Sequence, residues 1–191
     1  RQREVYRRRH HADVDPLALG FATFYLNRTS RSGVLGAGVI GGYDQAGSYK
    51  IDARFDKDVL RGRIEKLAEL SGKIRVTKQD GAARLRQYLP KDNVFAYVDP
   101  PYVEKGSSLY MSAFEEQDHI ELARVLNGYS NTNWVLTYDV AGLIRSLYKA
   151  RDVSEFRLLY SAHLRGSKNE LRRPSARELI VLSNTVADAL G

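Results

Sequence analysis

An apolar run that ends abruptly in charged, rigid and aromatic residues constrains this chain more than any other feature. Residues 94–105 read VFAYVDPPYVEK, so five strand-forming residues are followed at once by Asp99, Pro100, Pro101 and Tyr102. Such an uninterrupted apolar strand is typical of a sheet covered on both faces. Open α/β sheets carry their binding sites at the carboxyl ends of their strands. The four residues alone leave two interpretations open: a proline turn that closes the strand, or part of an active site.

The same four residues suit methyl transfer to the exocyclic amino group of a base. That nitrogen is a poor nucleophile because its lone pair is delocalised into the ring, and acceptors for both N–H groups favour a pyramidal nitrogen that can attack. Asp99 offers a carboxylate acceptor, and the carbonyl of Pro100 offers a second on a backbone with two fixed φ angles. Tyr102 offers an aromatic face for a base flipped out of the duplex, a contact worth about 1–3 kcal/mol.

Helical and strand-like patterns alternate through most of the chain. Helices are predicted over residues 57–71, 80–89, 116–127 and 140–149, and strands over 73–77, 94–98, 134–138, 156–162 and 178–183. The pattern predicts a largely parallel, three-layer α/β sheet whose last two strands form an antiparallel hairpin, since no helix separates them. Residues 1–55 read instead as helices broken at Asp15-Pro16, followed by a glycine-rich basic loop. We therefore expect two regions, 1–55 and 56–191.

Charge and composition narrow the class of partner. The chain has 30 Lys and Arg against 23 Asp and Glu, a net charge of +7 that suits a polyanion, although a basic surface without a ligand is the alternative. It has no cysteine, which excludes disulfides and thiolate zinc sites. The four histidines, His10, His11, His119 and His163, lack metal-ligand spacing, so we expect no metal. We expect no membrane span either.

Several segments, in order along the chain, resemble the Dam-type DNA adenine N6-methyltransferases. They are FYLNR (24–28), GSYKIDARF (47–55), DPPY (99–102), LYMSAF (109–114) and RELIVLSN (177–184). The resemblance implies a Rossmann-like methyltransferase sheet, S-adenosylmethionine as cofactor and double-stranded DNA as substrate. It also implies a cytoplasmic protein of bacterial or phage origin. It assigns target recognition to residues 1–55 and catalysis to 56–191. It also gives catalytic roles to Asp99, Pro100 and Pro101, the stacking role to Tyr102, and a place beside the cofactor to Asp99.

The resemblance is incomplete on the cofactor side. Asp80 lies where the family contacts the adenosyl group, although a helix N-cap explains it equally well. The family's F-x-G-x-G cofactor segment is absent from these 191 residues, and Gly36-Ala37-Gly38 is no substitute because it follows a helix. We therefore expect a fragment whose sheet lacks its first strands, which binds S-adenosylmethionine weakly and self-associates through an exposed edge. The alternative function is a non-catalytic DNA-binding fragment or a degenerate methyltransferase relative.

Predicted DNA contacts come from two loops. In the family, DNA is bound by the segment that here contains Arg28, Arg31, Tyr49 and Lys50. Arg165 and Lys168, between the last two strands, are candidates for phosphate contact, with a solvated loop as the alternative in both places. Members that read GATC carry an aromatic residue, an asparagine and an arginine where this sequence has Arg31, Ser32 and Gly36, so the sequence does not predict a GATC target.

Overall fold

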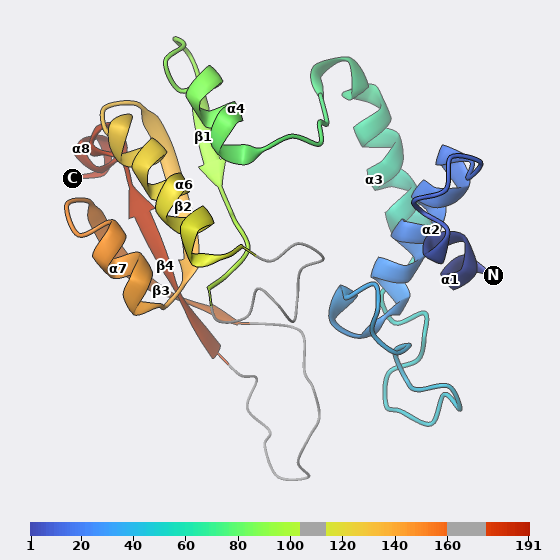
Figure 1. The fold of residues 1–191 in the computed structure, drawn as a ribbon. Coiled ribbons are helices and arrows are strands. Elements are labelled where there is room, and N and C mark those ends of the chain that lie inside the picture. Colours follow the sequence, from blue (N-terminus) through green and yellow to red (C-terminus); the bar gives the residue numbers. More distant parts are fainter. Residues whose placement is uncertain (104–113, 160–174) are drawn as a thin grey trace. The chain divides into compact units, whose positions relative to one another are not determined.

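The structure is a computed structural model of the chain that describes residues 1–103, 114–159 and 175–191 (Figure 1). The chain forms two compact units: unit 1 is Arg1–Val76 with Ser161–Lys168, and unit 2 is Thr77–Tyr160 with Asn169–Gly191. None of the described helices is long and apolar enough to cross a membrane. The functional division into residues 1–55 and 56–191 stays a prediction.

The described residues of unit 1, 1–76, form helices and a loop between them. Its elements are α1 (Gln2–Arg7), α2 (Pro16–Thr29), the 3-10 turn η1 (Arg31–Gly33), α3 (Lys57–Glu69) and the 3-10 turn η2 (Ser71–Lys73). Asp15 caps α2, because its carboxylate accepts a hydrogen bond from the Ala18 N–H at 2.7 Å. Asp56 caps α3 in the same way through the Val59 N–H at 3.0 Å. Both predicted helix starts are therefore confirmed.

The glycine-rich segment between α2 and α3 folds back on itself. The Gln45 amide donates to the Ile40 carbonyl and accepts from the Ile51 N–H, each at 2.8 Å. Gly41 has a φ of +84°, and a Cβ there would lie 2.7 Å from the Tyr49 carbonyl oxygen. Only glycine fits this position, since other residues rarely adopt a positive φ and the approaching backbone leaves no room for a side chain.

Unit 2 is a mixed α/β unit built on a four-stranded sheet. Its elements are α4 (Gly81–Tyr88), β1 (Phe95–Val98), α6 (Glu116–Gly128), β2 (Asn133–Asp139), α7 (Gly142–Leu147), β3 (Asp152–Leu159), β4 (Ser175–Leu182) and α8 (Asn184–Leu190). The strand order is β1-β2-β4-β3, with β1 and β2 parallel and β4 antiparallel to both of its neighbours. The predicted C-terminal hairpin is confirmed.

Two predictions about the sheet are wrong for the described residues. The sheet is not largely parallel, because β4 lies between β2 and β3 and is antiparallel to both of them. Residues 73–77 do not form a strand: Lys73 ends η2, and residues 74–80 have no regular secondary structure. Strand propensity alone does not hold a segment extended, because its N–H and C=O groups need a neighbouring strand.

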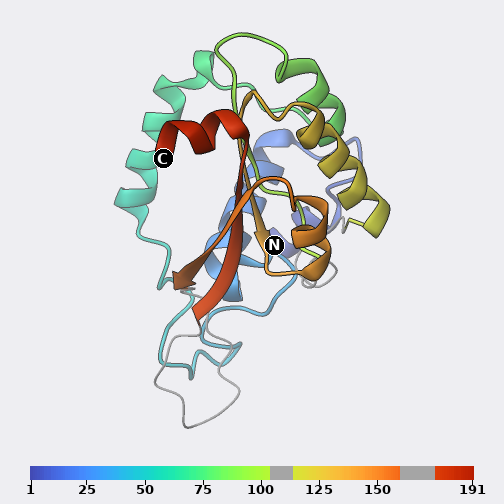
Figure 2. The ribbon, with the colours of Figure 1, turned by 90° about the vertical axis from the view of Figure 1, so that its left-hand side faces the viewer.

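One face of the sheet carries the core of unit 2. Trp134, Leu136 and Tyr138 alternate along β2 and are fully buried, together with Leu179 and Val181 of β4. They pack against apolar residues of α6 and α7. Figure 2 shows α4, α6 and α7 on one side of the sheet and α8 on the other. The interior strands β2 and β4 are therefore firm supports for the residues at their ends.

Candidate active site

The DPPY turn begins where β1 ends. β1 stops at Val98, and Asp99 follows with its side chain exposed to solvent. Pro100 is buried, whereas Pro101 and Tyr102 are half-buried. Because each proline fixes its own φ angle, the turn holds the carboxylate and the aromatic ring in a defined relation.

A hydroxyl group from the neighbouring strand orients Asp99. Thr137 Oγ1 of β2 donates a hydrogen bond to Asp99 Oδ1 at 3.1 Å. The same Oγ1 lies 3.0 Å from the hydroxyl of Tyr97 on β1. A threonine hydroxyl has one proton, and Thr137 gives it to Asp99, so Tyr97 is the donor to Thr137. This chain of hydrogen bonds fixes one carboxylate oxygen of Asp99 and leaves the other, Oδ2, for a ligand.

Two buried carboxylates hold the residues that follow the prolines. The Tyr102 hydroxyl donates to Glu178 Oε1 of β4 at 2.8 Å, and the Val103 N–H donates to Asp139 Oδ1 of β2 at 3.0 Å. Asp139 and Glu178 are directly opposite each other in the β2–β4 ladder, and both are buried. Adjacent residues of the turn are thus attached to adjacent strands of the sheet.

A buried histidine supports the start of α6. His119 Nδ1 and the Tyr138 hydroxyl share a hydrogen bond of 2.6 Å, and the His119 ring packs on Phe114 with ring centroids 5.3 Å apart. Burial lowers the pKa of His119 despite nearby carboxylates, of which Asp139 is the largest influence. Burial raises the pKa of Tyr138 far above its ordinary value. Both side chains are therefore neutral at pH 7. Residues 109–113 of the predicted closing segment lie outside the described residues.

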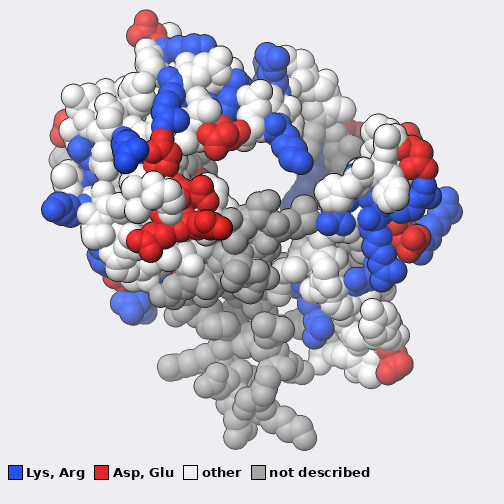
Figure 3. Space-filling model, viewed as in Figure 1, with Lys and Arg blue, Asp and Glu red and all other residues white. Residues whose placement is uncertain are grey.

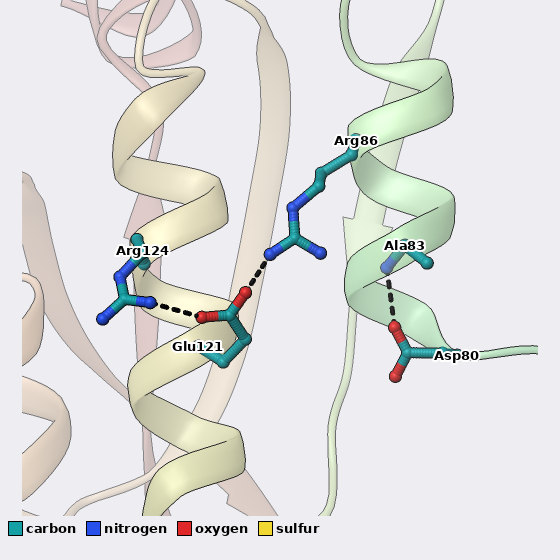
Figure 4. Close-up of polar contacts among 5 residues, drawn as sticks. All are labelled: Asp80, Ala83, Arg86, Glu121 and Arg124. Carbon is teal, nitrogen blue, oxygen red and sulfur yellow. Dashed lines mark hydrogen bonds and ion pairs between the residues drawn. The ribbon is translucent and has the colours of Figure 1, made fainter.

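Asp80 is the N-cap of α4, as predicted, and its predicted contact with the adenosyl group stays a prediction. Its Oδ1 accepts a hydrogen bond from the Ala83 N–H at 2.7 Å (Figure 4). The helix is fixed to α6 by Glu121, which pairs with Arg86 of α4 and with Arg124 of α6 (Figure 4). α4 and β1 run in opposite directions and are joined by residues 89–94 (Figure 1). Asp80 therefore lies toward the same end of the sheet as Asp99.

Two of the predicted DNA contacts of unit 1, Arg28 and Lys50, make side-chain hydrogen bonds that hold the glycine-rich loop. Arg28 Nε donates to the Arg54 carbonyl at 3.2 Å, and Lys50 Nζ donates to the Gln45 carbonyl. Tyr49 is 73% exposed, and the exposed Arg31 lies against Gly38, where a Cβ would be 2.8 Å from its Nη2. Arg31 and Tyr49 are thus the better placed to meet a ligand. Arg165 and Lys168 lie outside the described residues.

Arg54 is a residue that sequence reasoning missed. Its Nη2 donates to the carbonyl oxygens of Asn27, at 2.8 Å, and Ser30, at 2.7 Å, at the end of α2. Burial and the neighbouring Arg28 lower the pKa of Arg54, with burial the larger cause. A cation at a helix C-terminus is favourable, so Arg54 closes the glycine-rich loop onto α2.

Basic charge is concentrated in unit 1. The sequence of unit 1 has 17 Lys and Arg against 9 Asp and Glu, whereas that of unit 2 has 13 against 14. The formal charges are therefore +8 and −1, which together give the +7 of the chain. Figure 3 shows acidic side chains gathered on unit 2 around the start of α6, which carries Glu115, Glu116 and Asp118. An electrostatic attraction for a polyanion therefore belongs to unit 1.

The described part of the chain contains no cluster of side chains that could bind a metal ion. There, no group of three or more His, Cys, Asp or Glu side chains is arranged to hold an ion. The buried carboxylates of Asp139 and Glu178 serve instead as hydrogen-bond acceptors.

The sequence matches one family model over most of its length. Residues 2–166 match the model of the D12 class N6 adenine-specific DNA methyltransferase. The chain belongs to this D12 class. The resemblance to the Dam-type adenine methyltransferases is therefore confirmed, and DNA adenine methylation is supported as the general activity of the family. The D12 match includes Asp80, Asp99 and Tyr102 but ends before Glu178. No curated protein matches the chain.

Proposed function

We propose that this D12-class protein transfers a methyl group from S-adenosylmethionine to N6 of adenine in double-stranded DNA. The observation that carries the proposal is the DPPY turn, in which Asp99 accepts a hydrogen bond from Thr137 of β2 and the Tyr102 hydroxyl donates one to Glu178 of β4. The sheet of unit 2 would then be part of a Rossmann-like methyltransferase fold, with residues 56–191 as its catalytic region.

Asp99 and Pro100 would act directly on the reacting nitrogen. Thr137 occupies Asp99 Oδ1, so Oδ2 would accept one N6–H group, and the Pro100 carbonyl would accept the other. Positive charge develops on N6 as the new bond forms. A fixed carboxylate beside N6 stabilises this charge and typically raises the rate by about 10²–10³-fold. The resulting ammonium group loses its proton to water, so Asp99 need not become protonated.

Tyr102 would hold the flipped adenine by stacking. Its ring is half-buried, and its hydroxyl donates to Glu178, so the contact with a flat base would come from the ring and not from the hydroxyl. Base–aromatic stacking contributes about 1–3 kcal/mol. This contact would replace part of the stacking that the base loses on leaving the duplex.

Asp80 would bind the adenosyl part of the cofactor. Its carboxylate is exposed, lies toward the same end of the sheet as Asp99, and uses Oδ1 for the Ala83 N–H. The remaining oxygen suits a ribose hydroxyl or an amino group, so this residue fits a nucleoside. When bound, S-adenosylmethionine supplies a methyl group on a positively charged sulfur.

Residues 1–55 would recognise the target. They contain the exposed Arg31 and Tyr49 and belong to the unit with a formal charge of +8. Arginine can pair with guanine or with phosphate. Self-association of the chain stays a prediction, motivated by β1 as an edge strand of the described sheet.

The proposal is tested by Asp99→Ala in the protein as its gene encodes it. We expect methyl transfer to fall by at least about 10²-fold while DNA binding is nearly unchanged, because Asp99 acts on the reacting nitrogen and not on the DNA backbone. Incorporation of tritiated methyl groups measures the rate, and fluorescence anisotropy measures binding. Asp92→Ala, in the exposed turn before β1, is the matched control and should be neutral. Near wild-type turnover of Asp99→Ala would exclude the role of Asp99.

A further inference from the structure

Glu178 has no role in the activity described so far, yet it contacts the aromatic ring of the DPPY turn. It is 3% exposed, and its Oε1 accepts the hydrogen bond of the Tyr102 hydroxyl at 2.8 Å. The two residues are 76 positions apart in the chain. Glu178 also lies beyond residues 2–166, so the family match assigns nothing to it.

We propose that Glu178 is a positioning residue that sets the Tyr102 ring in the orientation needed to stack on the target base, an inference that rests on the proposed function. The backbone of Glu178 is firmly placed, because β4 is an interior strand paired on both sides: Glu178 is opposite Asp139 of β2 and Phe156 of β3. The acceptor atom, Glu178 Oε1, belongs to a side chain on this paired backbone. The Tyr102 hydroxyl therefore has a fixed acceptor, and the ring has a fixed axis.

Asp139 complements this arrangement from the neighbouring strand. It accepts the N–H of Val103, the residue after Tyr102, at 3.0 Å. The backbone of the turn is thus held by Asp139 and the ring end by Glu178. The Tyr102 ring is half-buried and is held at its hydroxyl and at the adjacent backbone, so it loses little conformational entropy when a base stacks on it. Such preorganisation favours the reaction.

Three variants separate positioning from mere stability. Glu178→Ala removes the acceptor, Tyr102→Phe removes the donor but keeps the ring, and Glu178→Gln keeps an acceptor oxygen of the same shape. The substrate is genomic DNA from bacteria that lack adenine methylation, which supplies target sites without knowledge of the target sequence. We expect Glu178→Ala and Tyr102→Phe each to lower the single-turnover methylation rate about tenfold. We expect the double variant to be no slower than Tyr102→Phe, and Glu178→Gln to be close to wild type.

A spectroscopic measurement observes the ring itself. With 3-fluorotyrosine at position 102, we expect one narrow fluorine-19 resonance in the wild-type background and in Glu178→Gln, and a shifted or broadened one in Glu178→Ala. Glu155→Gln is the matched control, because Glu155 of β3 is a carboxylate of the same sheet that pairs with Arg145 and Arg177 instead. It should change neither the rate nor the resonance.

The inference and the proposed function fail in different ways. If the wild-type protein methylates DNA but Glu178→Ala keeps its rate, or the losses of the two single variants multiply in the double variant, Glu178 does not act through Tyr102. An unchanged fluorine resonance in Glu178→Ala also overturns the inference. A wild-type protein that methylates no adenine refutes the proposed function, and the resonance alone then decides whether Glu178 holds the ring.

Discussion

Thr137→Val isolates the hydrogen bond that orients Asp99. Thr137 is 5% exposed, and valine replaces its hydroxyl with a methyl group while keeping the branched shape that suits a strand. A hydrogen bond to a charged group contributes about 1.5–3 kcal/mol. Since Asp99 is exposed and water can take over part of the lost bond, the lower end applies. About 1.5 kcal/mol corresponds to a roughly tenfold lower rate of methyl transfer.

The fold should tolerate this change. Tyr97, which donates to Thr137, is 64% exposed, so its hydroxyl can bind water in the variant, and we expect the free energy of unfolding to change by less than about 1 kcal/mol. Single-turnover kinetics give the rate, and urea unfolding gives the stability. Thr137→Ser keeps the hydroxyl and should retain most of the activity. Wild-type turnover in Thr137→Val, or equal losses in the valine and serine variants, would refute the reasoning.

The remaining predictions concern recognition, the loop and pH. Arg31→Ala should weaken DNA binding or relax the sequence preference by about 1–3 kcal/mol, measured by anisotropy and by sequencing of modified DNA. Arg61→Ala, on the exposed face of α3, is the control, and equal effects of the two variants would mean that Arg31 makes no specific DNA contact. Arg54→Ala should destabilise unit 1 by about 1–3 kcal/mol, because the carbonyl of the buried Ser30 loses its donor. Amide hydrogen exchange of residues 40–53 should increase, and unchanged exchange would mean that Arg54 does not hold the loop onto α2. His119 is expected to make stability fall as the pH decreases below about 6.5. Its folded-state pKa is lowered, so the unfolded chain binds the proton first, and the stability present above pH 6.5 is lost on the way down to the folded-state pKa. Urea unfolding at pH 7.5 and 5.5 should show a smaller decrease for His119→Gln than for wild type, and equal decreases would mean that other groups are responsible.

Local signals in the sequence were sufficient for several features. An aspartate before an amphipathic segment correctly placed the starts of α2, α3 and α4, because capping depends on residues only three positions apart. The apolar run before Asp99 likewise predicted β1. The expected cover on both faces of this strand is wrong, because Phe95 and Tyr97 are exposed in the edge strand β1. The strand expected over residues 73–77 did not form, since extended structure depends on a partner that the segment itself does not specify.

The supports of the site could not be predicted in this way. Thr137 is 38 positions from Asp99, and Glu178 is 76 positions from Tyr102, so their proximity depends on strand order and register. Both residues left a weak signal as polar side chains near the ends of apolar strands, in WVLTYD and RELIVLS. The DNA contact of Arg28 stays a prediction, and no local signal in the sequence indicated that its Nε, at the end of α2, donates to the Arg54 carbonyl.

The central claim is methylation of adenine N6 in DNA, and nucleoside analysis tests it most directly. Duplex DNA that lacks adenine methylation is incubated with the protein as its gene encodes it and with S-adenosylmethionine carrying a deuterated methyl group. The DNA is then digested to nucleosides and analysed by mass spectrometry. The account predicts deuterated N6-methyladenine, formed by the wild type and by Asp92→Ala but reduced at least about 10²-fold in Asp99→Ala. Label found only on cytosine, only on RNA offered in the same reaction, or equally with Asp99→Ala would contradict the account.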